Sequence, residues 1–181
     1  MEKSIVIYYS NTGSNKYLAD KIANSLNCPM EAIRPRVKNF GLMLMGGWTK
    51  ISLGNHPIKS DLTQFDRVIL VGPIWTGQLI SPLRNFLKKY KQQINELHFA
   101  TCCGSYDEIK DDKFGYGRVF DKIKALVGDA NIHCEAFPIV MVLPEDKRED
   151  SELVMATRLN DENFTGAIEE RFENFIEEVT M

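Results

Sequence analysis

A short polar segment near the N-terminus has the residue types of a phosphate-binding turn. It consists of Ser10, Asn11, Thr12, Gly13, Ser14 and Asn15. Every second residue carries a hydroxyl group, and the glycine lets the backbone turn sharply. Backbone N–H groups, hydroxyls and the positive end of a following helix dipole can together bind a phosphate. A polar turn that only caps the helix is the alternative interpretation.

Two later turns carry aromatic or sulfur-containing side chains beside glycine. The first contains Pro73, Ile74, Trp75, Thr76 and Gly77, and the second contains Cys102, Cys103, Gly104, Ser105 and Tyr106. An indole in one turn and a phenol ring in the other could enclose a flat heterocycle, because each offers a stacking face. A Trp75 side chain buried in the core is the alternative.

Several other phosphate and metal motifs are absent from the sequence. There is no G-x-x-x-x-G-K-[ST] loop, and no G-x-G-x-x-G follows the first strand-like run. A receiver domain would need acidic residues where this chain has Tyr9 and Ser10. The three histidines lie at no metal-ligand spacing from one another or from a cysteine pair, so no metal site is expected.

Hydrophobic patterns predict the elements that position these turns. A continuous apolar and β-branched run covers residues 4–9, and two further runs, at 67–72 and 97–101, are also typical of strands buried on both faces of a parallel sheet. Each run precedes one of the turns, and helical patterns follow at 16–26, 82–90 and 116–127. Weaker strands are expected at 31–33 and 132–137, and a closing amphipathic helix at 164–179. This alternation predicts an α/β fold, in which the carboxyl ends of parallel strands bring all three turns to one edge.

Two segments do not fit this alternation. Residues 40–48 are apolar and interrupted by three glycines, which predicts either a weak second crossover helix or a flap or partner surface. Residues 144–162 are polar and charged, and we expect them to form a long surface excursion.

Composition narrows the function classes. The chain has 181 residues, of which 44% are hydrophobic and 26% charged, as expected for a single globular domain spanning residues 1–181. No apolar run approaches the roughly 20 residues that a membrane helix needs. No signal peptide is recognised, and four cysteines are too few for a disulfide framework, so we expect a reduced, cytoplasmic protein. No basic, aromatic-interleaved surface is apparent, so no nucleic-acid partner is expected.

Together the three turns resemble the FMN-binding loops of the flavodoxin family. The first is similar to the phosphate loop of that family, [ST]-x-T-G-x-[TN]. The run from Val71 to Gly77, followed by Pro82 and by Phe86-Leu87, resembles its second loop and helix. The likeness extends over about residues 3–180. It implies a doubly wound, five-stranded parallel sheet in the order 2-1-3-4-5, with helices on both faces and one non-covalent FMN.

The resemblance also implies a role for each turn. The first turn would hold the phosphate of FMN, and the other two would hold its isoalloxazine ring, with Trp75 and Tyr106 as stacking partners. Asn15 stands where threonine is commoner, and its amide is expected to donate to a phosphate oxygen. Cys103 stands where the family often has a small residue.

The function implied in this way is that of an electron carrier that docks transiently with redox partner proteins. An FMN-dependent NAD(P)H:quinone-type oxidoreductase is the alternative, in which residues 34–60 cap a substrate pocket or form a homodimer interface. A binding module that has kept the fold and lost the flavin is a third hypothesis. The first two differ in whether a pyridine nucleotide reduces the flavin directly.

Overall fold

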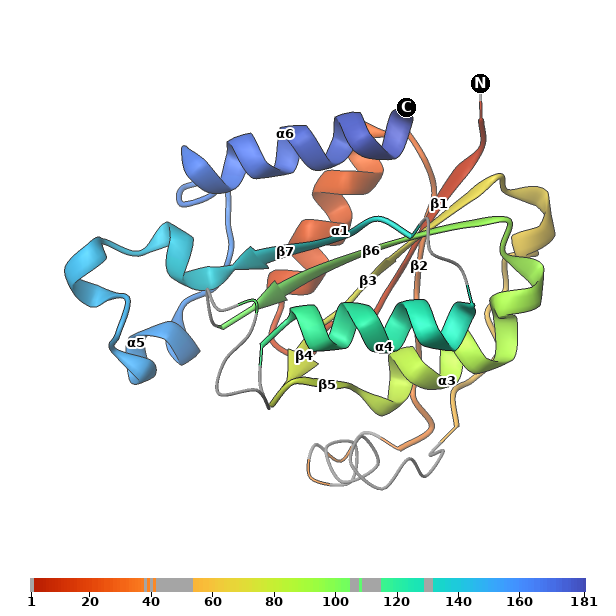
Figure 1. Cartoon of the computed structure of the whole chain (residues 1–181), viewed down its shortest axis with the longest axis horizontal. Coiled ribbons are helices and arrows are strands. Elements are labelled where there is room, and N and C mark those ends of the chain that lie inside the picture. The colour runs from red at the N-terminus through yellow and green to blue at the C-terminus, as the bar shows by residue number, and fades with distance from the viewer. Residues whose placement is uncertain are drawn as a thin grey trace.

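The fold is built on a five-stranded parallel sheet in the order β2-β1-β3-β6-β7 (Figure 1). The computed structural model describes residues 2–37, 39, 41, 54–104, 108, 115–128 and 132–181. The strands are β1 (Ser4–Tyr8), β2 (Met30–Ala32), β3 (Arg67–Val71), β6 (Glu96–Cys103) and β7 (Cys134–Pro138). Without the two short strands of a separate hairpin, this order is 2-1-3-4-5. The expected doubly wound topology is confirmed.

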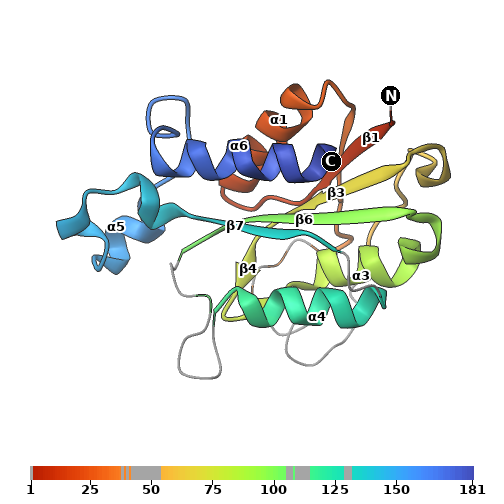
Figure 2. The same cartoon turned by 45° about the horizontal axis from the view of Figure 1, so that its top comes forward.

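Helices cover both faces of the sheet (Figures 1 and 2). On one face lie α1 (Ser14–Ser25) and α6 (Ala167–Thr180), and on the other lie α3 (Ser81–Tyr90) and α4 (Gly117–Val127). Successive strand residues point to opposite faces, so Val6 packs with the α1 and α6 side chains whereas Ile5 and Ile7 pack with those of α3 and α4. Each face of the sheet therefore has its own hydrophobic core, as expected for a parallel sheet.

The observed ends of two elements differ from the sequence-based expectation in ways that matter for the site. Helix α1 begins at Ser14, so the last two residues of the first turn form its opening turn. Strand β6 continues to Cys103 instead of ending at Thr101, because Cys102 and Cys103 pair with Phe137 and Pro138 of β7. The assignment of these two cysteines to a turn was wrong: they belong to the strand.

The long connection between β7 and α6 is more than a surface excursion. It contains α5 (Ser151–Ala156), two 3-10 turns (Ile139–Val142 and Glu145–Lys147) and then a return to the core at Leu159, which is 5% exposed. The Tyr17 hydroxyl donates to Asp161 over 2.8 Å, so this segment is bound to α1. In Figure 1 the connection projects from the edge at which β6 and β7 end.

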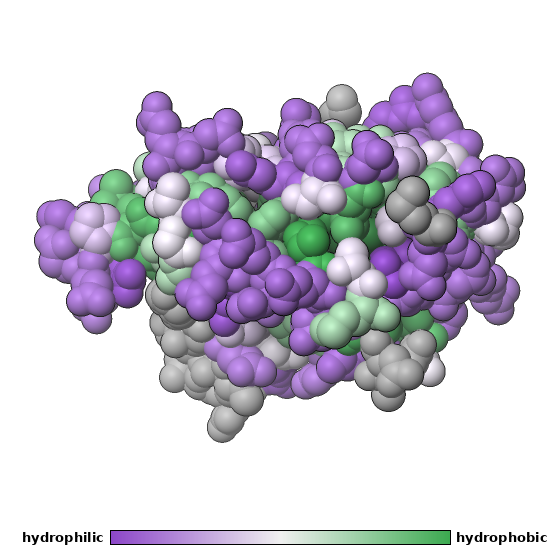
Figure 3. Space-filling view, turned by 90° about the horizontal axis from the view of Figure 1, so that it is seen from above, coloured by the Kyte–Doolittle hydropathy of each residue, from purple (hydrophilic) through white to green (hydrophobic). Residues whose placement is uncertain are grey.

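The surface above α1 and α6 is mainly hydrophilic, with apolar side chains visible between polar ones (Figure 3). No helix in the described ranges is long and apolar enough to cross a membrane. Of the apolar segment 40–48, only Gly41 lies within the described residues, so the expectation for that segment stays a prediction.

Glu31 of β2 holds the chain that returns toward β3. Its carboxylate accepts hydrogen bonds from the backbone N–H of Lys59 (2.7 Å) and from the N–H and hydroxyl of Ser60 (2.9 and 2.8 Å). Burial alone raises the pKa of Glu31, but these bonds and the nearby Arg34 outweigh it, and the pKa is lowered overall. The ionised carboxylate is therefore the form that stabilises the fold.

We expect Glu31→Gln to reduce the free energy of unfolding by about 2 kcal/mol at pH 7, because the bonds to a charged acceptor are weakened. A lowered folded-state pKa contributes stability above the unfolded value of about 4.3, and that stability is lost as the pH falls through the folded value. Urea denaturation of the two proteins should thus differ at pH 7 and converge well below pH 4. Glu162→Gln removes the same charge from an exposed position and is the control. A difference independent of pH would contradict this account.

Candidate functional site

The first turn leaves the N-terminus of α1 open. Gly13 is the N-cap residue, with φ of 110°, a conformation that side chains other than glycine rarely adopt. Its N–H donates to the Ser10 hydroxyl over 3.1 Å, which closes the turn upon itself. No side chain caps the helix, and its first turn contains no acidic residue. The backbone N–H groups at this helix end can therefore donate hydrogen bonds to an anion.

The second turn is a β-hairpin. Strands β4 (Ile74–Trp75) and β5 (Gln78–Leu79) pair antiparallel, and the two residues between them both have positive φ, 48° at Thr76 and 64° at Gly77. This is the pattern of a type I′ turn, although threonine is strained in it. Lys122 of α4 donates to the carbonyl of Gly77 over 2.9 Å, so the hairpin tip is fastened to the helix below it.

The third turn is described only in part. Ser105 and Tyr106 lie outside the described residues, so their expected contact with the ring stays a prediction. Cys102 and Cys103 are buried at the end of β6, and Gly104 follows them in an exposed position. Burial raises the pKa of the Cys102 thiol far above its usual value, so this thiol stays protonated and has a packing role.

Asn15 connects the first turn to the end of β6. Its side-chain amide donates to the carbonyl of Cys102 over 3.0 Å, and its side-chain carbonyl accepts from the N–H of Cys102 over 2.8 Å. Strand β3 ends at Val71, after which Gly72 donates to Ala100 of β6. The Asn15 side chain thus bonds the backbone of β6 just beyond the point at which β3 leaves it. This bond uses one of the two N–H groups of the Asn15 amide, and the expected contact between Asn15 and a phosphate stays a prediction.

One cavity, of about 210 Å³, is lined by all three turns. Thr12, Ser14 and Asn15 come from the first turn and the start of α1; Pro73, Ile74 and Trp75 come from the hairpin; Cys102, Cys103 and Gly104 come from β6 and its end. Ser10, Asn11 and Gly13 face a different pocket instead, and neither of these two cavities is lined by Thr76 or Gly77. Trp75 is half-buried: it lines this cavity and also packs against the core under α3 and α4.

The connection between β7 and α6 supplies part of this cavity, which the sequence did not indicate. Ile139, Val154, Met155, Thr157 and Arg158 contribute to its lining. The backbone N–H of Leu159 donates to the hydroxyl of Ser14 over 3.2 Å, which brings this segment against the N-terminus of α1. A polar, irregular stretch carries no periodic signal that would assign it to a site so far away in the sequence.

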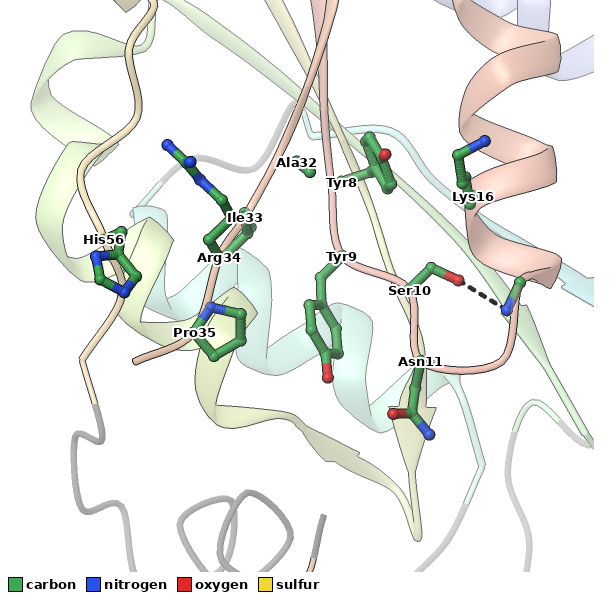
Figure 4. Close-up of a pocket in the computed structure, with 11 residues that line it drawn as sticks. Tyr8, Tyr9, Ser10, Asn11, Lys16, Ala32, Ile33, Arg34, Pro35 and His56 are labelled. Carbon is green, nitrogen blue, oxygen red and sulfur yellow. Dashed lines mark hydrogen bonds between the residues drawn. The ribbon is translucent and has the colours of Figure 1, made fainter. Parts of the chain in front are cut away.

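A larger pocket, of about 780 Å³, lies on the other side of the first turn (Figure 4). It is formed at the carboxyl ends of β1 and β2, where Tyr8 and Tyr9 point in opposite directions from successive positions. The two charged residues that line this pocket are Lys16 and Arg34. His56 also lines it, and no carboxylate is among the described lining residues. Lys16 is paired with Asp20 over 3.2 Å.

The fold and the cavity define a doubly wound α/β protein with a polar turn at the switch point of its sheet, where β1 and β3 lie side by side. Comparison with known proteins agrees with this class. The family model described as a flavodoxin domain matches residues 49–137, which include the hairpin and the end of β6 but not the first turn. The predicted resemblance to the flavodoxin family is thereby confirmed over these residues, and the fold is flavodoxin-like.

Solved structures support the fold. A flavoprotein from Lactobacillus acidophilus, crystallised in complex with FMN, has a TM-score of 0.60 at 14% identity and covers 75% of this chain and 91% of its own. A flavodoxin from Streptococcus pneumoniae has a TM-score of 0.50 at 15% identity and covers 98% of this chain and 97% of its own. No curated protein matches the sequence. At these identities the likeness establishes the fold alone.

Proposed function

We propose that this protein binds one FMN in the cavity formed by the three turns and acts as a flavodoxin-like electron carrier. The observation that carries the proposal is that one cavity is lined both by the N-terminus of α1 and by the hairpin. The open N-terminus of α1, with Thr12 and Ser14, suits a phosphate group, and the hairpin with Trp75 offers an apolar face to a flat ring.

The residues present fit the two ends of this cofactor. A phosphate needs several N–H or O–H donors and no nearby carboxylate, and the first turn of α1 meets both requirements. The ring needs an aromatic or apolar wall, which Pro73, Ile74 and Trp75 supply. When bound, FMN supplies the redox chemistry, while the protein orients it and controls access to it.

The size of the cavity favours a carrier. Pockets that enclose a small molecule measure about 300–1,000 Å³, whereas this cavity measures about 210 Å³. The cavity that the described residues line is smaller than this range, and we propose that part of the cofactor faces solvent or a partner. An exposed edge is what electron transfer to a docked redox protein requires.

An FMN-dependent NAD(P)H:quinone-type oxidoreductase is the second candidate, and the larger pocket beside the first turn favours it. Its volume of about 780 Å³ is sufficient for a small ligand, and Arg34 and Lys16 suit a phosphate-bearing nucleotide. The pocket adjoins the proposed phosphate site through Ser10, Asn11 and Gly13, which line it.

An anaerobic titration of the FMN-reconstituted protein separates these functions. We expect the protein to bind FMN, to keep its oxidised visible spectrum when NADH or NADPH is added, and to lose that spectrum with dithionite. Direct bleaching by either nucleotide would favour the oxidoreductase, and a charge reversal at Arg34 should then slow it. Failure to bind FMN at all would contradict both functions and leave a binding module without flavin.

A further inference from the structure

Arg158 lies at the proposed cofactor cavity although it is far from the three turns in the sequence. Two hydrogen bonds fix the backbone around it. The following N–H, of Leu159, donates to the Ser14 hydroxyl at the start of α1, and the side-chain amide of Asn163 donates to the carbonyl of Arg158 over 2.7 Å. Leu159 is buried in the core between the sheet and α6. The backbone position of Arg158 is therefore well defined relative to α1.

Arg158 lines the cavity and is exposed. Its Nη1 atom donates to the carbonyls of Met155 and Thr157, at the end of α5. A guanidinium group has five N–H donors, so these two contacts leave others with which to bind an anion. The charge of Arg158 also acts on the Cys102 thiol, where it opposes the larger effect of burial on the pKa.

Arg158 is the one charged residue among those that line this cavity, within the part of the chain that the structure describes. The first turn itself contains no lysine or arginine. Lys16, the nearest basic residue in the sequence, is paired with Asp20 and lines the other pocket. A phosphate ester at the N-terminus of α1 would thus meet helix N–H groups and hydroxyls from the first turn, and among the described lining residues Arg158 alone would add a full positive charge.

We propose that Arg158 binds the phosphate group of the cofactor and makes the site selective for a phosphorylated flavin over the same flavin without phosphate. This inference rests on the proposed FMN site. Hydrogen bonds from a guanidinium to a phosphate are charge-assisted and stronger than those from neutral donors. The connection between β7 and α6 therefore has a binding role, which is to deliver this side chain to the phosphate turn.

The test is to measure the dissociation constants of FMN and riboflavin for the wild-type protein and for Arg158→Gln. We expect the variant to bind FMN roughly tenfold more weakly, since hydrogen bonds to a charged group contribute at least about 1.5 kcal/mol. Its riboflavin affinity should change less than about twofold, because riboflavin has no phosphate to lose contact with. Arg158→Lys should recover part of the FMN affinity, since it keeps the charge without the planar fork.

Arg148→Gln is the matched control. Arg148 lies in the same connection, with its Nε bonded to the carbonyl of Leu143, and is not among the residues that line the cavity. The FMN affinity of the Arg148→Gln protein should equal that of the wild-type protein. Inorganic phosphate should compete with FMN but not with riboflavin, and more weakly in the Arg158→Gln protein, which distinguishes a bound ester from a free anion at this site.

Each other outcome has a definite meaning. Equal losses for FMN and riboflavin would show that Arg158 only supports the fold of the cavity, and unchanged FMN binding would show that it contributes nothing; either result overturns this inference and leaves the FMN site intact. If the wild-type protein binds riboflavin and FMN equally well, phosphate selectivity is absent and the inference is wrong. If it binds neither, the proposed function fails as well.

Discussion

Asn15→Ala is expected to lower the free energy of unfolding by about 3 kcal/mol. The substitution removes two buried hydrogen bonds and leaves both the N–H and the carbonyl of Cys102 without their partner. A buried polar group left unsatisfied costs about 1–3 kcal/mol, and two are created here. Asn15 is 5% exposed, so water cannot readily replace its amide.

The measurement is urea or guanidinium denaturation, with a lower midpoint and an unchanged m-value as the expected result. Asn11→Ala is the matched control, because it removes the same side chain from an exposed position in the same turn. Asn15→Asp should not rescue stability: the carboxylate could still accept from the N–H of Cys102, but it would face the carbonyl of Cys102 and place a charge in a buried site. A loss below about 1 kcal/mol for Asn15→Ala would mean that the connection to β6 is dispensable.

Trp75→Ala is expected to weaken FMN binding by roughly 10- to 100-fold. Stacking of a flat heterocycle on an aromatic side chain is worth about 1–3 kcal/mol by alanine substitution, and each 1.4 kcal/mol is a factor of ten. Trp75 lies in β4 at the cavity wall, and the hairpin fixes its direction through pairing with Gln78. The change in flavin fluorescence on binding gives the dissociation constant.

Two comparisons separate stacking from structural damage. Trp75→Phe keeps an aromatic face and should bind FMN within a few-fold of the wild type. The stability of the protein without FMN, measured by denaturation, should fall only modestly in Trp75→Ala, since the side chain is half-buried. Unchanged FMN affinity combined with a large loss of stability would favour the alternative interpretation, in which Trp75 is a core residue only.

The sequence patterns were sufficient to predict an alternating α/β fold that brings the three turns to one edge, and the resemblance to the flavodoxin family implied the strand order. The three inner strands β1, β3 and β6 are mainly apolar because both of their faces are covered by helices, and such runs are visible without any knowledge of their partners. Right-handed crossovers then bring the carboxyl ends of parallel strands to one edge. For that reason Ser14 and Trp75 could be assigned to one site from local patterns.

The tertiary structure decided the roles of individual polar side chains within that site. Cys102 and Cys103 extend β6 because β7 pairs with them, and a partner strand so far along the chain leaves no mark on the local pattern. Asn15 also bonds the backbone of Cys102, at a point of β6 that β3 no longer covers. Arg158 reaches the cavity through a connection without periodicity, held by the bond between Leu159 and Ser14. Periodicity reports which face of an element is buried, whereas the partner of a polar atom is set by packing between distant segments.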